Sequence, residues 1–151
     1  MIFKLTTRHA VCAVVYLVEQ GGDKIVTAEE IAENRDIPAS YLARILGRMA
    51  KAGVVTSFHG GRDKGYRIAR DANSITLFEI LDLFERWSEK GCLMRPTHDG
   101  CDCPAKHYWH AIQERMFGPL KQITLGDLCN RNTSEGLESI QKRFFRNQVD
   151  R

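Results

Sequence analysis

The chain has 151 residues and a mass of 17.2 kDa, a size that suits one small domain with an appended segment. Hydrophobic residues make up 43% of it, and no apolar run reaches the roughly 18 residues that a transmembrane helix requires. The net charge of +3 is unevenly distributed, because residues 35–70 hold eight Lys and Arg against two Asp. Such a basic block indicates a polyanionic partner, although a solvated helix face would carry the same charge.

The N-terminal stretch AVCAVVYLV is apolar but ends at Glu19 with no small-residue cleavage site, which favours a core helix over a signal peptide. Without an export signal we predict a cytoplasmic protein, where disulfides are rare and clustered thiols bind metal or act in redox chemistry. The five cysteines are also an odd number, which does not suit a disulfide framework.

The first half of the chain predicts three helices and a β-hairpin. Residues 7–19 have valines at helical spacing, and Thr27 and Glu30 form a capping box that opens a second helix. Pro38 separates this helix from a third one, which ends at Gly53. The apolar stripe of the third helix consists of Leu42, Ile45, Leu46 and Met49.

After the third helix, VVTSF and YRIAR predict two strands joined by the glycine-rich turn HGGRDKG. Three helices followed by a hairpin is the order of a winged helix-turn-helix domain, which we place at residues 1–75. The predicted fold class is therefore mainly α with a small β-hairpin wing.

In such a domain the N-terminal part of the third helix enters the major groove of DNA. This position predicts base-edge or phosphate contacts for Ser40 and Tyr41, and a guanine contact for Arg44. Arg48 lies further along the helix, where phosphate contact is expected. Tyr41 has a second interpretation, in which it packs at the hinge between the helices.

The turn of the hairpin is the second predicted DNA contact. It offers His59, Arg62 and Lys64 on a loop that can enter a groove, and narrow minor grooves attract arginine in particular. The glycines of this turn lack the spacing of a phosphate-binding loop, so they are also consistent with a simple turn.

Residues 76–130 form the second predicted unit. Thr76 and Glu79 make a capping box for a fourth helix, residues 88–103 are expected to be a loop, and Pro104 suits the first turn of a long helix. A short helix over ITLGDL follows, and residues 131–151 form a polar tail that includes the weakly amphipathic LESIQKRFFRN.

The long helix carries an apolar stripe with steps of three and four residues, which little of the remaining chain can bury. A homodimer through this helix is the prediction, and folding back onto its own domain is the alternative. The stripe consists of Trp109, Ile112, Met116, Leu120 and Ile123.

Three of the five cysteines, Cys92, Cys101 and Cys103, lie in a segment rich in Gly, Pro, Asp and Thr, where burial is not expected. Thiolates select zinc, copper(I) and iron–sulfur clusters. The spacing differs from the close cysteine pairs of structural zinc sites and suits a cluster with a further ligand from elsewhere. Cys129, and at this point Cys12, are interpreted as small apolar side chains.

Several segments resemble the winged-helix family of bacterial iron–sulfur regulators that includes IscR and NsrR. The resemblance covers nearly the whole chain, in the order LTTRHAVCAV, IPASYLARIL, MAKAGVV, ITLFEIL and ITLGDL. It implies a dimeric transcription factor that binds a pseudo-palindromic operator in double-stranded DNA. It also implies an iron–sulfur cluster on the three cysteines before the dimerisation helix, and a DNA affinity that depends on the state of the cluster.

The chain departs from this family in three places. Cys101 and Cys103 are spaced more closely than the corresponding pair in most members. The histidine that IscR-like members place three residues before the tryptophan falls on Lys106. A position that is acidic in some cluster regulators is Ala43 here.

The fourth cluster ligand stays open among several candidates. His107 is one residue from the IscR-like position, whereas the acidic first-helix ligand of NsrR-like members falls on Arg8. Another branch uses the position of Cys12, so Cys12 or His9 from the partner subunit, or a small molecule, are further candidates. Both 2Fe–2S and 4Fe–4S clusters remain consistent with the sequence.

The predicted function is a transcriptional regulator and not an enzyme, because no catalytic triad, paired carboxylates or C-x-x-C motif is present. In this hypothesis, changes at the cluster reposition the cysteine segment and alter the spacing of the two recognition helices of the dimer. The alternative is the same fold acting as a zinc-containing or cluster-free thiol regulator.

Overall fold

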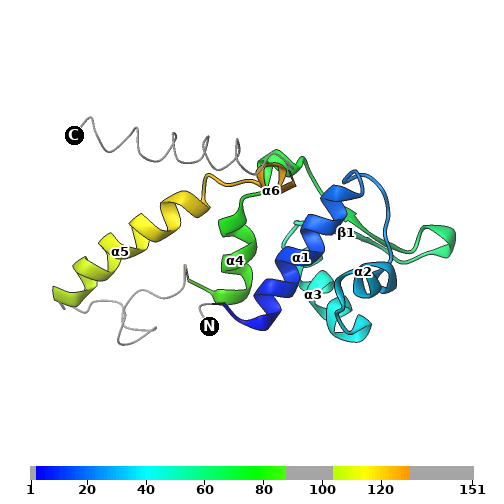
Figure 1. Ribbon diagram of the computed structural model, residues 1–151, viewed down its shortest axis with the longest axis horizontal. Helices are drawn as coiled ribbons and strands as arrows, with labels where there is room; N and C mark the ends of the chain where they lie inside the picture. Colours follow the sequence, from blue (N-terminus) through cyan, green and yellow to red (C-terminus); the bar gives the residue numbers. More distant parts are fainter. Residues whose placement is uncertain (1–2, 88–103, 130–151) are drawn as a thin grey trace.

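The computed structural model describes residues 3–87 and 104–129 (Figure 1). It confirms a mainly helical fold with one two-stranded antiparallel hairpin. In chain order the elements are α1 (Leu5–Glu19), α2 (Ala28–Arg35), α3 (Ala39–Lys51), β1 (Val55–Phe58), β2 (Gly65–Ile68), α4 (Leu77–Glu85), α5 (Pro104–Leu120) and α6 (Leu125–Cys129). Two 3-10 turns, η1 (Gly61–Asp63) and η2 (Ala72–Ser74), complete the described elements.

Local side-chain caps fix the starts of α2 and α4, as the sequence predicts. Thr27 Oγ1 accepts a hydrogen bond from Glu30 N at 3.1 Å, and Thr76 Oγ1 accepts one from Glu79 N at 3.2 Å. Just after the C-terminal end of α3, Gly53 has φ of +73°, the left-handed conformation that ends a helix. α1 begins at Leu5, two residues before its predicted start.

The core lies between α1, α2 and α3. The predicted apolar stripe of α3 is buried in full, and it packs with the inner face of α1 and with Ile31 of α2. Each large aliphatic side chain removed from water contributes about 2 kcal/mol to stability, so this face fixes which side of α3 remains for solvent or a partner. The buried side chains of α3 are Leu42, Ile45, Leu46 and Met49.

The hairpin is the wing, and a third short segment braces it. β1 and β2 pair in antiparallel register, with Val55 opposite Ile68. On the other edge of β2, Val26 and Tyr66 exchange two backbone hydrogen bonds of 2.9 and 2.8 Å. Gly65 lies so close to this brace that a Cβ there would be 2.6 Å from Val26 O, so this position requires glycine.

The helices after the wing share the core of the first domain. Leu77 N donates to Ile123 O at 2.7 Å, and Leu125 N donates to Ile75 O at 2.9 Å, which ties the start of α4 to the start of α6. Leu125 is completely buried in the common core. Residues on the two sides of the predicted boundary at 75 are thus packed as one body.

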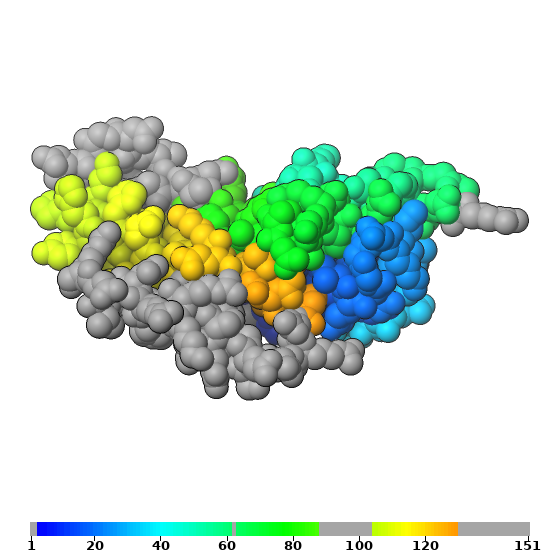
Figure 2. Space-filling model, turned by 90° about the horizontal axis from the view of Figure 1, so that it is seen from above, coloured from blue at the N-terminus to red at the C-terminus, as the bar shows by residue number. Residues whose placement is uncertain are grey.

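α5 extends away from this body, at the end opposite the wing (Figure 1). Its attachment is aromatic: Trp87 stacks on Phe117 with ring centroids 4.8 Å apart, and Phe78 contacts Phe117 at 5.3 Å. α6 then returns to lie against α1, as the view from above shows (Figure 2). Among residues 3–87 and 104–129, no helix has the length and apolar character to cross a bilayer.

Candidate nucleic-acid interface

The N-terminal end of α3 is open to solvent. Ala39 and Ser40 are exposed, and no side chain caps this end, where Pro38 occupies the N-cap position. The first backbone N–H groups of a helix lack intrahelical partners and favour anionic groups such as phosphate. The structure therefore places Ser40, a predicted DNA contact, at an accessible helix terminus.

Tyr41 lies half-buried between α3 and α1. Its hydroxyl and Thr6 Oγ1 are 2.6 Å apart, and its ring and the His9 ring make a T-shaped contact with centroids 5.6 Å apart. The exposed Arg44 places its guanidinium 5.5 Å from the centre of the Tyr41 ring. Tyr41 thus packs on α1 and not at the hinge between α2 and α3, and its ring also supports Arg44.

Arg48 is directed toward α4. Its Nη2 donates to Leu83 O at 2.6 Å, and its guanidinium lies 5.0 Å from the centre of the Phe84 ring. The carbonyl groups at the end of a helix carry partial negative charge, so this end of α4 attracts an arginine. In the absence of DNA, these two contacts with α4 hold the Arg48 side chain. The phosphate contact of Arg48 stays a prediction.

The hairpin projects at the end of the domain opposite α5 (Figure 1). His59 is exposed, with its Nε2 atom 3.2 Å from Ser57 Oγ, and Lys64 is exposed beside the turn η1, in which Arg62 lies. Arg67 on β2 is also exposed, and its guanidinium lies 5.2 Å from the Phe58 ring. The prediction counted Arg67 in the basic block but did not select it, although alternation along β2 would have placed it outward.

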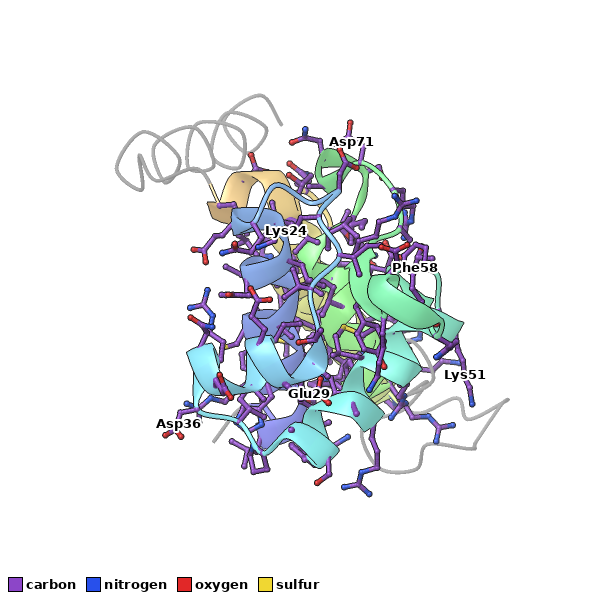
Figure 3. The ribbon with its side chains drawn as sticks, turned by 90° about the vertical axis from the view of Figure 1, so that its right-hand side faces the viewer. Lys24, Glu29, Asp36, Lys51, Phe58 and Asp71 are labelled. Carbon is purple, nitrogen blue, oxygen red and sulfur yellow. The ribbon has the colours of Figure 1, made fainter. Side chains whose placement is uncertain are left out.

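The C-terminal end of α3 and the end of β1 lie on one side of the domain. Figure 3 shows Lys51, at the end of α3, and Phe58, at the end of β1, toward the same side of the view, with Asp36 on the opposite side. Lys51, at this end of α3, is therefore on the same side of the domain as the hairpin, where one polyanion could meet both.

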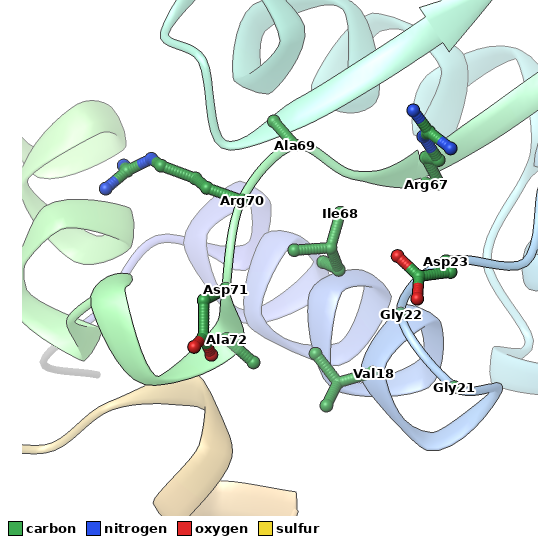
Figure 4. A pocket seen from close by; sticks show the side chains of 10 residues that line it. All are labelled: Val18, Gly21, Gly22, Asp23, Arg67, Ile68, Ala69, Arg70, Asp71 and Ala72. Carbon is green, nitrogen blue, oxygen red and sulfur yellow. The ribbon is translucent and has the colours of Figure 1, made fainter.

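An open cleft of about 490 Å³ lies at the base of the wing, between the end of α1 and the end of β2 (Figure 4). Three of its four charged side chains, those of Arg67, Arg70 and Asp71, already have partners. Arg70 pairs with Glu79, the Asp71 carboxylate accepts from Asn73 N at 2.8 Å, and Arg67 stacks on Phe58. Because these groups are engaged, we do not assign a ligand to this cleft.

The three predicted cluster cysteines, Cys92, Cys101 and Cys103, lie outside the described residues, so their geometry is not part of this structure. His107 is exposed in the first turns of α5. Within the described ranges, no group of three or more His, Cys, Asp or Glu side chains is arranged to hold a metal ion.

The candidate ligands on α1 differ in their environment. Cys12 is exposed, and its thiol is thus accessible to a partner. His9 is half-buried, its ring meets Tyr41, and its Nδ1 is buried without a hydrogen-bond partner among the described residues. Cys129 is half-buried, with Sγ 3.8 Å from Val15 O, and burial, aided by the nearby Glu19, raises the pKa of its thiol.

The sequence is similar to those of known transcriptional regulators. The sequence profile of Rrf2, described as an iron-dependent transcriptional regulator, matches residues 3–131. A protein of Aquifex aeolicus, provisionally assigned as an HTH-type transcriptional regulator, is 33% identical over 86% of this chain and 92% of its own length. The HTH-type transcriptional regulator IscR of Photobacterium profundum is 30% identical over 93% of this chain and 82% of its own.

Solved structures share the fold. CymR of B. subtilis, the global cysteine regulator, superposes with a TM-score of 0.70 at 21% identity, over 87% of this chain and 98% of that one. IscR of T. potens superposes with a TM-score of 0.66 at 23% identity, over 85% of each chain. These relatives are transcriptional regulators and not enzymes, and the match over residues 3–131 shows that the chain belongs to the Rrf2 family of transcriptional regulators.

Proposed function

We propose that the protein is a cytoplasmic regulator that binds a DNA operator through α3 and the wing, with an affinity controlled by an iron–sulfur cluster at Cys92, Cys101 and Cys103. The observation that carries the DNA-binding part is the division of α3 into two faces. All four of its large aliphatic side chains are buried, while Ser40, Arg44 and Lys51 are exposed. A helix that turns hydroxyl and guanidinium groups outward suits the major groove.

A homodimer is the proposed form of this regulator. The inner side of α5 carries the buried Gln113 and Phe117, but Tyr108, Ile112 and Met116 are 75%, 55% and 41% exposed on the outer side. Three large apolar side chains on one projecting helix favour a second copy of the same chain as the cover. The twofold symmetry of such a dimer favours a pseudo-palindromic operator.

The donor set suits an iron–sulfur cluster. Three soft thiolates would hold it, and the exposed imidazole of His107 or the exposed thiol of Cys12 from the partner subunit is available to complete the ligands. His9 is the weaker candidate, because its ring packs on Tyr41. When bound, such a cluster would supply a centre that gains or loses electrons or reacts with small oxidants, on the segment that joins α4 and α5 in the sequence.

The test begins with an anaerobic purification, a UV–visible spectrum, and iron and sulfide assays. We expect a brown protein whose absorption is lost in Cys92→Ser, Cys101→Ser and Cys103→Ser, while the control Cys129→Ser keeps it. Titration of a duplex selected from a randomised pool should then give different affinities for the loaded and stripped protein. Equal affinities would show that the cluster does not control DNA binding.

The fourth ligand is a separate measurement on the same preparation. His107→Ala or Cys12→Ser should shift the visible spectrum and make the cluster easier to lose, and the variant with the effect identifies the ligand. No change in either variant would assign the position to a small molecule or to another residue.

The second candidate is a cluster-free thiol or zinc-containing regulator with the same DNA interface. It is supported by the fold similarity to CymR, whose solved structures include an oxidised form from Staphylococcus aureus at a TM-score of 0.66 and 22% identity. A colourless protein that contains zinc, or no metal, would favour it. DNA binding would then depend on thiol oxidation or on the metal content.

A further inference from the structure

We propose that Tyr41 and Arg48 are positioning residues of the recognition helix α3 and not DNA contacts, an inference that rests on the proposed DNA-binding function. Both were predicted from the sequence to touch DNA. In the structure both polar ends are occupied by other parts of the chain: the Tyr41 hydroxyl by Thr6 on α1, and the Arg48 guanidinium by the end of α4.

The Tyr41 contact fixes the N-terminal half of α3 against α1. The 2.6 Å separation from Thr6 Oγ1 is that of a good hydroxyl–hydroxyl hydrogen bond, and the His9 ring closes the space beside the tyrosine ring. Because the side chain is held at both places, its ring offers a fixed surface to Arg44. Arg44 then remains as the exposed guanidinium of this half of the helix.

The Arg48 contact fixes the C-terminal half of α3 against α4. A hydrogen bond of 2.6 Å to Leu83 O and the approach to the Phe84 ring engage both the edge and the face of the guanidinium. Moving Arg48 to a phosphate would break both contacts and leave the carbonyl at the end of α4 without this donor.

The two contacts are joined to each other behind α3. The carboxylate of Glu85, the residue after Phe84, accepts hydrogen bonds from Lys4 N at 2.8 Å and from Thr7 Oγ1 at 2.5 Å. Lys4 Nζ in turn donates to Phe84 O at 2.9 Å. The start of α1, which holds Tyr41, and the end of α4, which holds Arg48, are therefore one supporting unit.

A double-mutant cycle separates positioning from contact at Tyr41. If the hydroxyl acts through Thr6, then Tyr41→Phe and Thr6→Val should each weaken binding to the selected duplex by roughly fivefold, the size of one net hydrogen bond. The double variant should bind no more weakly than either single variant. Thr6→Ser, which keeps the hydroxyl, should bind like the wild type. If Tyr41→Phe weakens binding while Thr6→Val does not, the hydroxyl touches DNA and the proposal is overturned for this residue.

The salt dependence of binding to a fixed non-specific duplex gives the answer for Arg48. Affinity falls as salt rises, and the steepness of this fall, taken as a positive slope of log Kobs against log[salt], decreases by about 0.9 for each lost phosphate contact. Arg48→Met should leave the slope unchanged while it lowers affinity for the selected duplex, whereas Lys64→Met at the wing should lower the slope. Lys121→Met, which removes a cation from the Phe78 ring outside α3 and the wing, is the matched control and should change neither. A lower slope in Arg48→Met would show a phosphate contact.

The failure of this inference differs from the failure of the proposed function. A wild-type protein that binds no duplex at any salt concentration refutes DNA binding itself. A wild-type protein that binds DNA, with variants that follow the contact pattern, refutes only the positioning roles. Thermal unfolding of each variant shows that the compared proteins are folded.

Discussion

Removing the Glu85 carboxylate tests whether the junction of α1 and α4 contributes to stability. Glu85 is 5% exposed, and its Oε1 accepts hydrogen bonds from Lys4 N and from the hydroxyl of the fully buried Thr7. It also lies at the N-terminus of α1, where negative charge interacts favourably with the helix dipole. The perturbation is Glu85→Ala, which deletes the acceptor without adding volume.

The structure sets the expected magnitude. Glu85→Ala leaves the Thr7 hydroxyl buried without this acceptor, at a cost of about 1–3 kcal/mol, and the Lys4 N–H loses a second bond at about 1 kcal/mol. The ion pair adds little, because the Lys4 side chain is 57% exposed and its Nζ is 3.6 Å from Oε2. We expect a loss of about 2–4 kcal/mol in the free energy of unfolding. Glu85→Gln keeps one acceptor oxygen and should lose less.

The same residue predicts a pH dependence. Burial alone would raise the pKa of Glu85, but the hydrogen bonds from Thr7 and Lys4 and the Lys4 charge outweigh it and lower the pKa. Because the folded-state pKa is the lower one, the stabilisation is present above the unfolded-state value of about 4.3 and is lost as pH falls through the folded-state pKa. The difference between wild type and Glu85→Gln should therefore shrink in acid.

Urea unfolding followed by circular dichroism, at neutral pH and in acid, measures both effects. Glu33→Ala, at an exposed position of α2, is the control and should unfold like the wild type. Equal unfolding free energies for wild type and Glu85→Ala at neutral pH would refute the reasoning. A wild-type advantage over Glu85→Gln that grows in acid would refute the assigned direction of the pKa shift.

Three further predictions use other parts of the chain. Gly65→Ala should destabilise the protein by about 2–4 kcal/mol, because its Cβ would meet Val26 O at 2.6 Å and its φ is +151°. In the same urea assay the control Gly60→Ala should unfold like wild type, because a Cβ at position 60 would have no neighbouring atom within 4 Å. In protein stripped of metal, iodoacetamide should modify the exposed Cys12 faster than Cys129, whose thiol pKa is raised by burial. Peptide mass spectrometry measures both rates, and equal rates would contradict the burial of Cys129. Ile112→Glu should shift the mass measured by light scattering from dimer to monomer, and an unchanged mass would place the dimer interface elsewhere.

The helices and the wing were predictable because their signals are local. The capping boxes at Thr27 and Thr76 join residues three positions apart, and the stripe of α3 repeats within one helix, so each can be recognised from a short window. The requirement for glycine at position 65 was not predictable in the same way, because it arises from the backbone of Val26 across the sheet edge.

The side-chain contacts of the site were less predictable, because they join residues far apart in sequence. Thr6 and Tyr41 are 35 positions apart, as are Arg48 and Leu83, and no periodicity links them. From sequence position alone, Tyr41, Arg44 and Arg48 were all candidate DNA contacts, with Arg48 expected at a phosphate and Tyr41 also consistent with packing. The tertiary fold separates them, since it gives the first two residues partners from α1 and α4.

The β-bridge between Thr76 and Thr124 anchors the chain just after α5, so α5 is held at its C-terminal end. The bridge and its flanking hydrogen bonds fasten the C-terminal end of α5 to the body of the protein. From this fulcrum the 17 residues of α5 reach outward by about 25 Å. A tilt of about 10° at the fulcrum would move the end at Pro104 by about 4 Å, for a helix of that rise per residue. A small tilt there would thus be amplified near His107, which lies in the first turns of α5.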